Sequence, residues 1–204
     1  MEANDRDELE ERIRAALAAA DHDAAVTLAL RGYGPEVLGF LCSQERDEQR
    51  AHDAFAQLGE DLWQGVAAYA HRSSFRTWMY AVARAALHRT RRAAGRREKR
   101  LRPMSAWEEA AEQVRSATAV ILRTETRDRF AALRDALPPE DRELLVLRVD
   151  RDMEWADLAR VLADRDDLDG DALKRESARL RKRFQLVKER LREMAEREGL
   201  LDPG

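Results

Sequence analysis

Side chains near the C-terminus, nearly all apolar, recur at alternating steps of four and three residues. The stripe they form consists of Leu173, Ser177, Leu180, Phe184, Val187, Leu191 and Met194. This spacing brings every member to one side of an α-helix, so the sequence predicts a long helix from about Ala172. Elsewhere apolar residues also recur three or four positions apart, and no run alternates as a strand requires. We therefore expect an all-α fold.

Shorter helices are predicted by the same spacing and by residues that start or stop helices. In the N-terminal half we expect helices over about 6–20, 21–30, 35–42, 51–69 and 75–92. Asp21 or Asp23 caps the second of these helices, and Ser73 or Ser74 caps the last. Short polar side chains at this position accept hydrogen bonds from the free backbone amides at the start of a helix. Gly32-Tyr33-Gly34-Pro35 is typical of a turn that starts the third. In the C-terminal half we expect helices over about 130–137, 139–149, 154–162 and 172–194.

The chain of 204 residues has room for two small domains. Pro103 breaks the helical pattern, and the apolar spacing from 101 to 124 is less regular, although Val120-Ile121-Leu122 indicates some helix there. We therefore expect a first domain over 1–100, a linker over 101–124 and a second domain over 125–204.

Charge is distributed in blocks that the net value of −3 conceals. From Arg84 to Arg102 nine Lys or Arg residues stand against one acid, and from Lys174 to Arg192 nine stand against two. Two basic blocks in an otherwise acidic protein indicate binding to a polyanion. The first 23 residues carry eight acids and three Arg. We interpret this acidic helix as a solubilising cap, with a partner site as the alternative.

Several classes of protein find no support in the sequence. The single cysteine, Cys42, cannot form an internal disulfide, which fits a reducing compartment. No stretch approaches 18 apolar residues and the N-terminus is acidic, so we expect neither a membrane span nor a signal peptide. The four histidines have no metal-ligand spacing, and there is no phosphate loop or nucleophile elbow. We expect a cytoplasmic protein that is not an enzyme and uses no cofactor or metal.

Aromatic and basic residues interleave in the segment 71–92. Aromatic faces stack on unpaired bases while Arg and Lys hold phosphates, so this mixture is typical of single-strand binding. The alternative is that the aromatic residues, Trp78 in particular, are core and the arginines form a solvated face. The residues expected to contact DNA here are Arg72, Ser73, Ser74, Phe75, Arg76, Trp78, Arg84, His88, Arg89, Arg91 and Arg92.

A second basic constellation lies at 154–183, where a short helix precedes a basic amphipathic one. This order is typical of a helix-turn-helix, whose second helix enters the major groove and presents its first residues to base edges. An ordinary helical hairpin with charged flanks is the alternative. The expected contacts are Lys174, Arg175, Ser177, Arg179, Arg181, Lys182 and Arg183.

Together these segments resemble the extracytoplasmic-function (ECF) subfamily of bacterial RNA polymerase sigma factors, over roughly residues 24–195. The run 75-FRTWMYAVAR-84 is similar to the signature of region two, and 51-AHDAFAQLGEDLW-63 to the helix before it. The run 137-LPPEDRELLVLR-148 resembles the opening of region four, and 154-EWADLARVL-162 resembles the first helix of its helix-turn-helix. The resemblance implies two small helical domains joined by a linker, the second a helix-turn-helix.

The resemblance also implies how such a chain works. Region two binds the polymerase core and captures the non-template strand of the minus-ten element, whereas region four reads the minus-35 element in duplex DNA. The polymerase supplies the chemistry, and the family often adds an inhibitory anti-sigma protein as a partner. By this resemblance the polymerase-binding residues are Asp53, Gln57, Asp61, Leu62 and Trp63.

The chain departs from the family at several positions. Ala85, Arg89 and Ala56 stand where members often have Asn, Asp and Gln, and five aspartates crowd the turn 164–171, of which Asp169 or Asp171 caps the recognition helix. These departures favour an alternative, a sigma-like regulatory module that binds polymerase or DNA without initiating. A third interpretation is a stand-alone dimeric helix-turn-helix regulator that uses the stripe over 173–194 as a zipper.

Overall fold

The computed structural model of the chain describes residues 3–45, 47–92, 106–107, 109–111, 113–114, 129–163 and 168–200. Throughout these residues the regular elements are helices, and none is a strand. The prediction of an all-α fold is thereby confirmed. Among the described helices, none combines the length and the apolar character that a membrane crossing requires.

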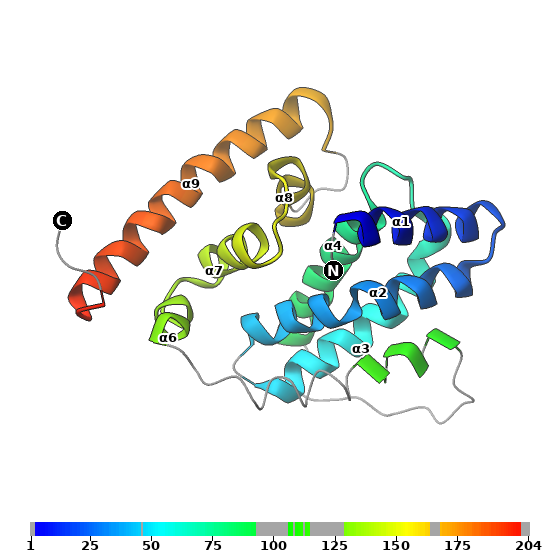
Figure 1. Cartoon of the computed structure of the whole chain (residues 1–204), viewed down its shortest axis with the longest axis horizontal. Coiled ribbons are helices and arrows are strands. Elements are labelled where there is room, and N and C mark those ends of the chain that lie inside the picture. Colours follow the sequence, from blue (N-terminus) through cyan, green and yellow to red (C-terminus); the bar gives the residue numbers. More distant parts are fainter. Residues whose placement is uncertain are drawn as a thin grey trace. The chain divides into compact units, whose positions relative to one another are not determined.

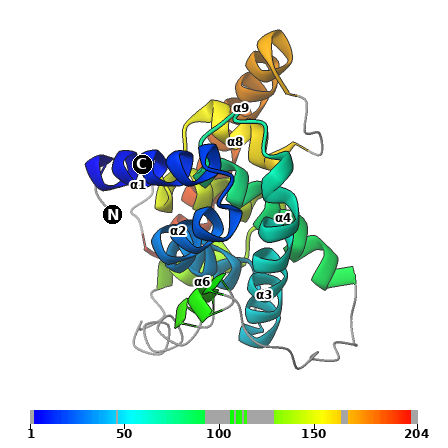
Figure 2. The same ribbon diagram turned by 90° about the vertical axis from the view of Figure 1, so that its right-hand side faces the viewer.

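The chain divides into two compact units, Met1–Arg123 and Thr124–Gly204. The first contains α1 (Ala3–Ala18), α2 (His22–Gln44), α3 (Glu48–Gly65), the 3₁₀ turn η1 (Val66–Ala68) and α4 (Phe75–Arg92). Helix α2 packs against α1, α3 and α4, and α3 packs along α4 (Figures 1 and 2). Its core includes the fully buried side chains of Tyr33, Phe40, Phe55 and Tyr80.

Helix α2 runs without interruption through Gly32-Tyr33-Gly34-Pro35, so the predicted turn there is wrong. The two glycines instead let other side chains approach the helix closely. A Cβ on Gly32 would lie 2.1 Å from Leu9 Cδ2, and a Cβ on Gly34 would lie 3.0 Å from Val114 Cγ2. This packing outweighs the loss of the backbone hydrogen bond that Pro35 cannot donate.

Part of the segment predicted as a linker packs on the first unit. Trp107, Ala110, Ala111 and Val114 are all buried. A side chain at Gly59 of α3 would collide with Trp107, because a Cβ there would lie 2.8 Å from the indole ring. The core of the first unit therefore extends past residue 100. The stretch Val120-Ile121-Leu122 lies outside the described residues.

The second unit contains α6 (Arg129–Asp135), α7 (Pro139–Leu145), the π-helical turn η2 (Val146–Asp150), α8 (Trp155–Leu162) and α9 (Gly170–Arg197). Pro139 begins α7, as predicted, because its fixed φ suits the first helical position. Helices α6, α7 and α8 all pack against the long helix α9 (Figure 1).

The apolar stripe on α9 faces these shorter helices. Val187 joins Leu137 and Leu145 in a buried cluster, and the partly buried Phe184, Leu191 and Met194 pack against it. Leu180 and Ser177 are buried nearer the start of the helix. The stripe is therefore covered by its own unit, which argues against its use as a zipper between two chains.

Candidate nucleic-acid interface

Helix α4 begins at the turn 72–76, where the sequence predicts DNA contacts. The Thr77 amide donates to Ser74 Oγ at 3.1 Å, and the Trp78 amide donates to the Ser74 carbonyl oxygen at 3.1 Å. Ser74 Oγ also lies 2.8 Å from Thr77 Oγ1. Of the two caps that the sequence allows, the structure confirms Ser74, which satisfies two of the first four amides of the helix.

The two amides that Ser74 does not reach are held by a residue of α1. The Phe75 amide donates to Glu10 Oε2 at 2.9 Å, and the Arg76 amide donates to Glu10 Oε1 at 3.0 Å. The buried Tyr33 hydroxyl donates to the same Oε1 at 2.9 Å. Burial and the neighbouring Glu10 carboxylate raise the pKa of Tyr33, so this hydroxyl keeps its proton. Sequence reasoning missed Glu10, because no spacing rule relates residues so far apart in the chain.

A cluster of aromatic rings supports the turn. The Tyr69 ring lies 5.2 Å from Phe75 and 5.1 Å from Trp78 between centroids, and Phe75 lies 5.0 Å from Trp78. The Tyr69 hydroxyl donates to the Ser73 carbonyl oxygen at 2.6 Å, and burial raises the pKa of Tyr69 to about 12. Phe75 is buried, so we leave its ring out of the proposed DNA surface. Trp78 is only partly buried.

Arg76 lies in the interior of the first unit. Its Nε donates to Glu36 Oε1 at 2.6 Å and its Nη2 to Glu36 Oε2 at 3.1 Å, and the guanidinium lies 5.3 Å from the Tyr80 ring centroid. Burial by itself lowers the pKa of Arg76, but the hydrogen bonds and charge of Glu36 outweigh it and raise the pKa. This side chain joins α4 to α2, and we leave it out of the DNA surface.

The basic end of α4 is joined to two other parts of the unit. Arg91 pairs with the Glu45 carboxylate and donates to the Gln44 carbonyl oxygen at 2.8 Å, at the end of α2. Arg89 pairs with Asp61 of α3 but remains half exposed. Arg91 therefore has a structural role, whereas Arg89 still presents its charge to solvent.

The remaining predicted contacts of this unit lie at or near the surface. Arg72 and Arg92 are exposed, and Ser73, Arg84 and His88 are partly buried. Residues 93–102, which complete the first basic block, lie outside the described residues. The cations that α4 offers to a ligand are thus concentrated toward its C-terminal end.

A cavity of about 380 Å³ lies between α1 and the turn before α4. Its lining includes Asp7, Glu10 and Arg14 from α1 and His71, Ser73 and Ser74 from the turn. The His71 backbone is left-handed, with φ 54°, and the His71 ring lies 4.6 Å from Tyr69. Polar groups from two separate elements therefore converge on one cavity.

The residues expected to bind polymerase follow α3. Asp53, Gln57 and Asp61 are partly buried and share one side of the helix, since they are four residues apart. Gln57 Nε2 donates to Asp61 Oδ1 at 2.9 Å. Trp63 is 49 % exposed, whereas Leu62 is fully buried in the core and is left out of the proposed surface.

In the second unit, two predicted DNA contacts on α9 turn inward. Ser177 is buried, and its Oγ donates to the Trp155 carbonyl oxygen of α8 at 3.2 Å. Arg183 donates to Asp141 at 2.8 Å and to Glu140 of α7 at 2.9 Å. Burial by itself lowers the pKa of Arg183, but these carboxylates raise it. Ser177 and Arg183 hold α9 in place, and we leave both out of the DNA surface.

The opposite side of α9 is exposed over its first half. This side, which we name the outer face, consists of Arg175, Ala178, Arg179 and Lys182. Arg179 donates to both carboxylate oxygens of Glu176, with Nη2 at 2.7 Å from Oε1. The outer face therefore has three cations around one small apolar residue.

Helix α9 begins directly after the acidic segment. Asp169 stands at the N-cap position, as the sequence predicts, but its side chain forms no capping hydrogen bond. Asp171 Oδ1 lies 3.3 Å from Nζ of the exposed Lys174. Asp164, Asp166 and Asp167 lie outside the described residues.

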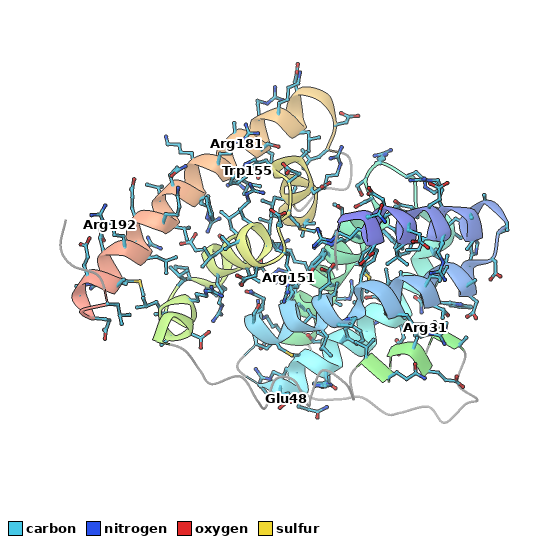
Figure 3. All side chains as sticks on the ribbon, viewed as in Figure 1. Arg31, Glu48, Arg151, Trp155, Arg181 and Arg192 are labelled. Atoms are coloured by element: carbon cyan, nitrogen blue, oxygen red, sulfur yellow. The ribbon has the colours of Figure 1, made fainter. Side chains whose placement is uncertain are left out.

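Trp155, the first residue of α8, lies beside cations from two elements. The Arg148 guanidinium from η2 lies 5.0 Å from a Trp155 ring centroid, and that of Arg181 from α9 lies 5.7 Å away. Figure 3 shows Trp155 and Arg181 near each other. Arg148 Nη1 also donates to the Met153 carbonyl oxygen at 2.6 Å. Sequence spacing missed Arg148, because that spacing assumes a regular α-helix and this residue lies in a π-helical turn.

Comparison of the chain with protein-family models, curated proteins and solved structures finds no match. Within the described part of the chain, no group of three or more His, Cys, Asp or Glu residues is arranged to hold a metal ion.

The Arg76–Glu36 pair gives a test of what positions α4. We expect Glu36→Gln and Arg76→Met each to lower the free energy of unfolding by about 3–5 kcal/mol, because each leaves a buried charge without its partner. The double variant should recover much of this loss, since it removes both charges. Urea unfolding followed by circular dichroism measures all three.

The exposed pair of Glu11 and Arg14, 3.3 Å apart on α1, provides the matched control. Glu11→Gln should cost less than about 1 kcal/mol, because solvent screens exposed pairs. Equal losses for Glu36→Gln and Glu11→Gln would show that the Arg76–Glu36 pair does not hold α4.

Proposed function

We propose that this chain is a sigma factor of the ECF type, which binds the RNA polymerase core and directs it to promoters. The observation that carries the proposal is the outer face of α9, whose cations are exposed while the other side of the helix is fixed against α7 and α8. A recognition helix needs both features, because it must be held rigidly while its free side enters the major groove.

The composition of the outer face supports reading of base pairs. An arginine such as Arg175 can donate two hydrogen bonds to guanine, and a small side chain such as Ala178 can contact a thymine methyl group. Lys182 and Arg179 supply charge for phosphates on either side. In this proposal α8 and α9 are the two helices of a helix-turn-helix that reads the minus-35 element.

The first unit supplies a different kind of contact. Ser73 and Trp78 lie around the turn before α4, and the cations Arg89 and Arg92 lie toward its far end. An unpaired base costs a few kcal/mol to unstack, and a polar cavity at the start of α4 together with cations toward its other end can offset that cost. We therefore assign capture of the minus-ten strand to the turn 72–76 and the exposed side of α4.

Joining the two contacts in one chain strengthens both. Once one unit has bound its element, the second binds at a high effective concentration, provided the linker spans the distance. The exposed Trp63 near the end of α3 suits contact with polymerase, because tryptophan is enriched among the residues that dominate binding energy at interfaces. The resemblance of 75–84 and 51–63 to sigma region two favours polymerase over other partners.

Transcription with purified components tests the proposal. Polymerase core plus this chain should start transcripts at promoters in a library of genomic fragments, whereas core alone should not. Trp63→Ala should reduce transcription mainly by weakening binding to core, since it removes a large apolar side chain that is 49 % exposed.

The outcomes separate the alternatives. Transcription from no fragment would contradict initiation. Binding to core without promoter opening would instead favour the regulatory module that the substitutions Ala85 and Ala56 suggest. Sequence-specific duplex binding without any affinity for core would favour a stand-alone regulator.

A second test distinguishes Arg175, to which we assign reading of base pairs, from Arg92, to which we assign binding of phosphates. Arg175→Ala should change the preference at particular base pairs of the duplex by about 1–3 kcal/mol, because it removes a bidentate pair of hydrogen bonds to a base. Arg92→Ala should weaken strand binding for all sequences alike and flatten its salt dependence by about 0.7 for each phosphate of the single strand that is no longer neutralised. Affinity selection at several salt concentrations measures both, and equal behaviour of the two variants would contradict the assignment.

A further inference from the structure

We propose that Glu10 is a positioning residue for strand capture, so that α1 belongs to the recognition site and is more than a cap on the first unit. The inference rests on the proposed function, because it concerns the turn 72–76 to which strand capture is assigned. It changes the expected role of the acidic N-terminal helix, which the sequence presents as a solubilising element.

Glu10 completes the hydrogen bonding at the start of α4. Ser74 accounts for the Thr77 and Trp78 amides, and Glu10 accepts from the remaining two, those of Phe75 and Arg76. Without Glu10 these two amides lose their protein partner. The start of α4 would then lose these two hydrogen bonds to α1.

Glu10 is itself held in place by neighbouring residues. The Tyr33 hydroxyl donates to Glu10 from the interior of α2. On the same helix α1, Leu9 and Ile13 are buried, and Leu9 occupies the space that a side chain at Gly32 would fill. Because the Glu10 carboxylate is held in one position, it can hold the turn in one position beside the cavity. A residue on a mobile segment could not do so.

The Glu10 carboxylate also affects the direction in which a bound strand can lie. The N-terminus of a helix carries partial positive charge, which ordinarily attracts a phosphate. Here the Glu10 carboxylate already occupies that position, and Asp7 adds a second acid to the cavity lining. The first amides of α4 are thus closed to a DNA phosphate, which leaves the cavity to the uncharged base, whereas phosphates several nucleotides along the strand can reach Arg89 and Arg92 toward the other end of the helix.

The test compares two variants that remove the same charge from the same helix. Glu10→Gln keeps the length of the side chain but cannot accept from both amides as a carboxylate does, whereas Glu8→Gln alters an exposed residue of α1. The probe is a fluorescein-labelled single strand that the unaltered full chain selects from a random-sequence DNA pool. The readout is the ratio of the Kd for a shuffled strand to the Kd for the selected strand.

We expect Glu10→Gln to lower this ratio about tenfold and Glu8→Gln to change it less than about twofold. Duplex binding by the second unit should be unchanged in both, which reports on overall integrity. Measurement at a temperature where circular dichroism shows both chains folded separates positioning from stability. A lower melting temperature with an unchanged ratio would overturn the inference.

Tyr33→Phe keeps the test decisive if Glu10→Gln does not fold. It removes one of the three hydrogen bonds to Glu10 and leaves the buried ring in place, so the ratio should fall about threefold; an unchanged ratio would overturn the inference. If the unaltered chain selects no strand, strand capture itself fails. If it selects one and the variants select it equally well, only the role of Glu10 fails.

Discussion

The start of α4 depends on two carboxylates that come from other helices. Glu36 of α2 holds the side chain of Arg76, and Glu10 of α1 holds the backbone amides of Phe75 and Arg76. Since these groups are partly shielded from solvent, the loss of a partner is costly, and the contacts fix three helices in relation to one another. The aromatic rings of Tyr69, Phe75 and Trp78 pack together at the same end of α4.

In the second unit, one side of α9 is held against the other helices and the opposite side is exposed. Asp141 of α7 is buried and accepts from both Arg183 and Arg190 at 2.8 Å, which holds the inner side of α9. The outer face, with Arg175 and Lys182, takes no part in this packing. In both units some arginines hold helices together while others remain exposed, and only the exposed ones enter the proposed function.

Much of the fold could be predicted because periodicity reports directly on which residues are buried. The stripe on α9, the break at Pro138-Pro139 and the cap at Ser74 all follow from local chemistry. The turn expected at Gly32-Tyr33-Gly34-Pro35 is wrong because glycine has two uses, and close packing of Leu9 is not visible in a local pattern.

The candidate site was harder to predict, because the type of a residue does not tell whether its side chain points into the core or toward solvent. Ser177 belongs both to the α9 stripe and to the expected DNA contacts. It is buried, as its position in the stripe indicates. Leu62 likewise falls on the apolar side of α3. Glu10 and Arg148 could not be found in this way, since one acts across the unit and the other lies in a π-helical turn.

Tethered cleavage of DNA tests the central claim, that two units of one chain read two promoter elements, most directly. An iron chelate is attached to cysteine at Ala70→Cys, before the turn, or at Asp171→Cys, at the start of α9, both exposed positions. Cys42→Ser removes the native thiol, whose pKa burial raises to about 11. With polymerase core and a promoter fragment, the first chelate should cut at the minus-ten strand and the second in the minus-35 duplex. Cleavage of one and the same segment by both chelates, or of neither, would contradict the account.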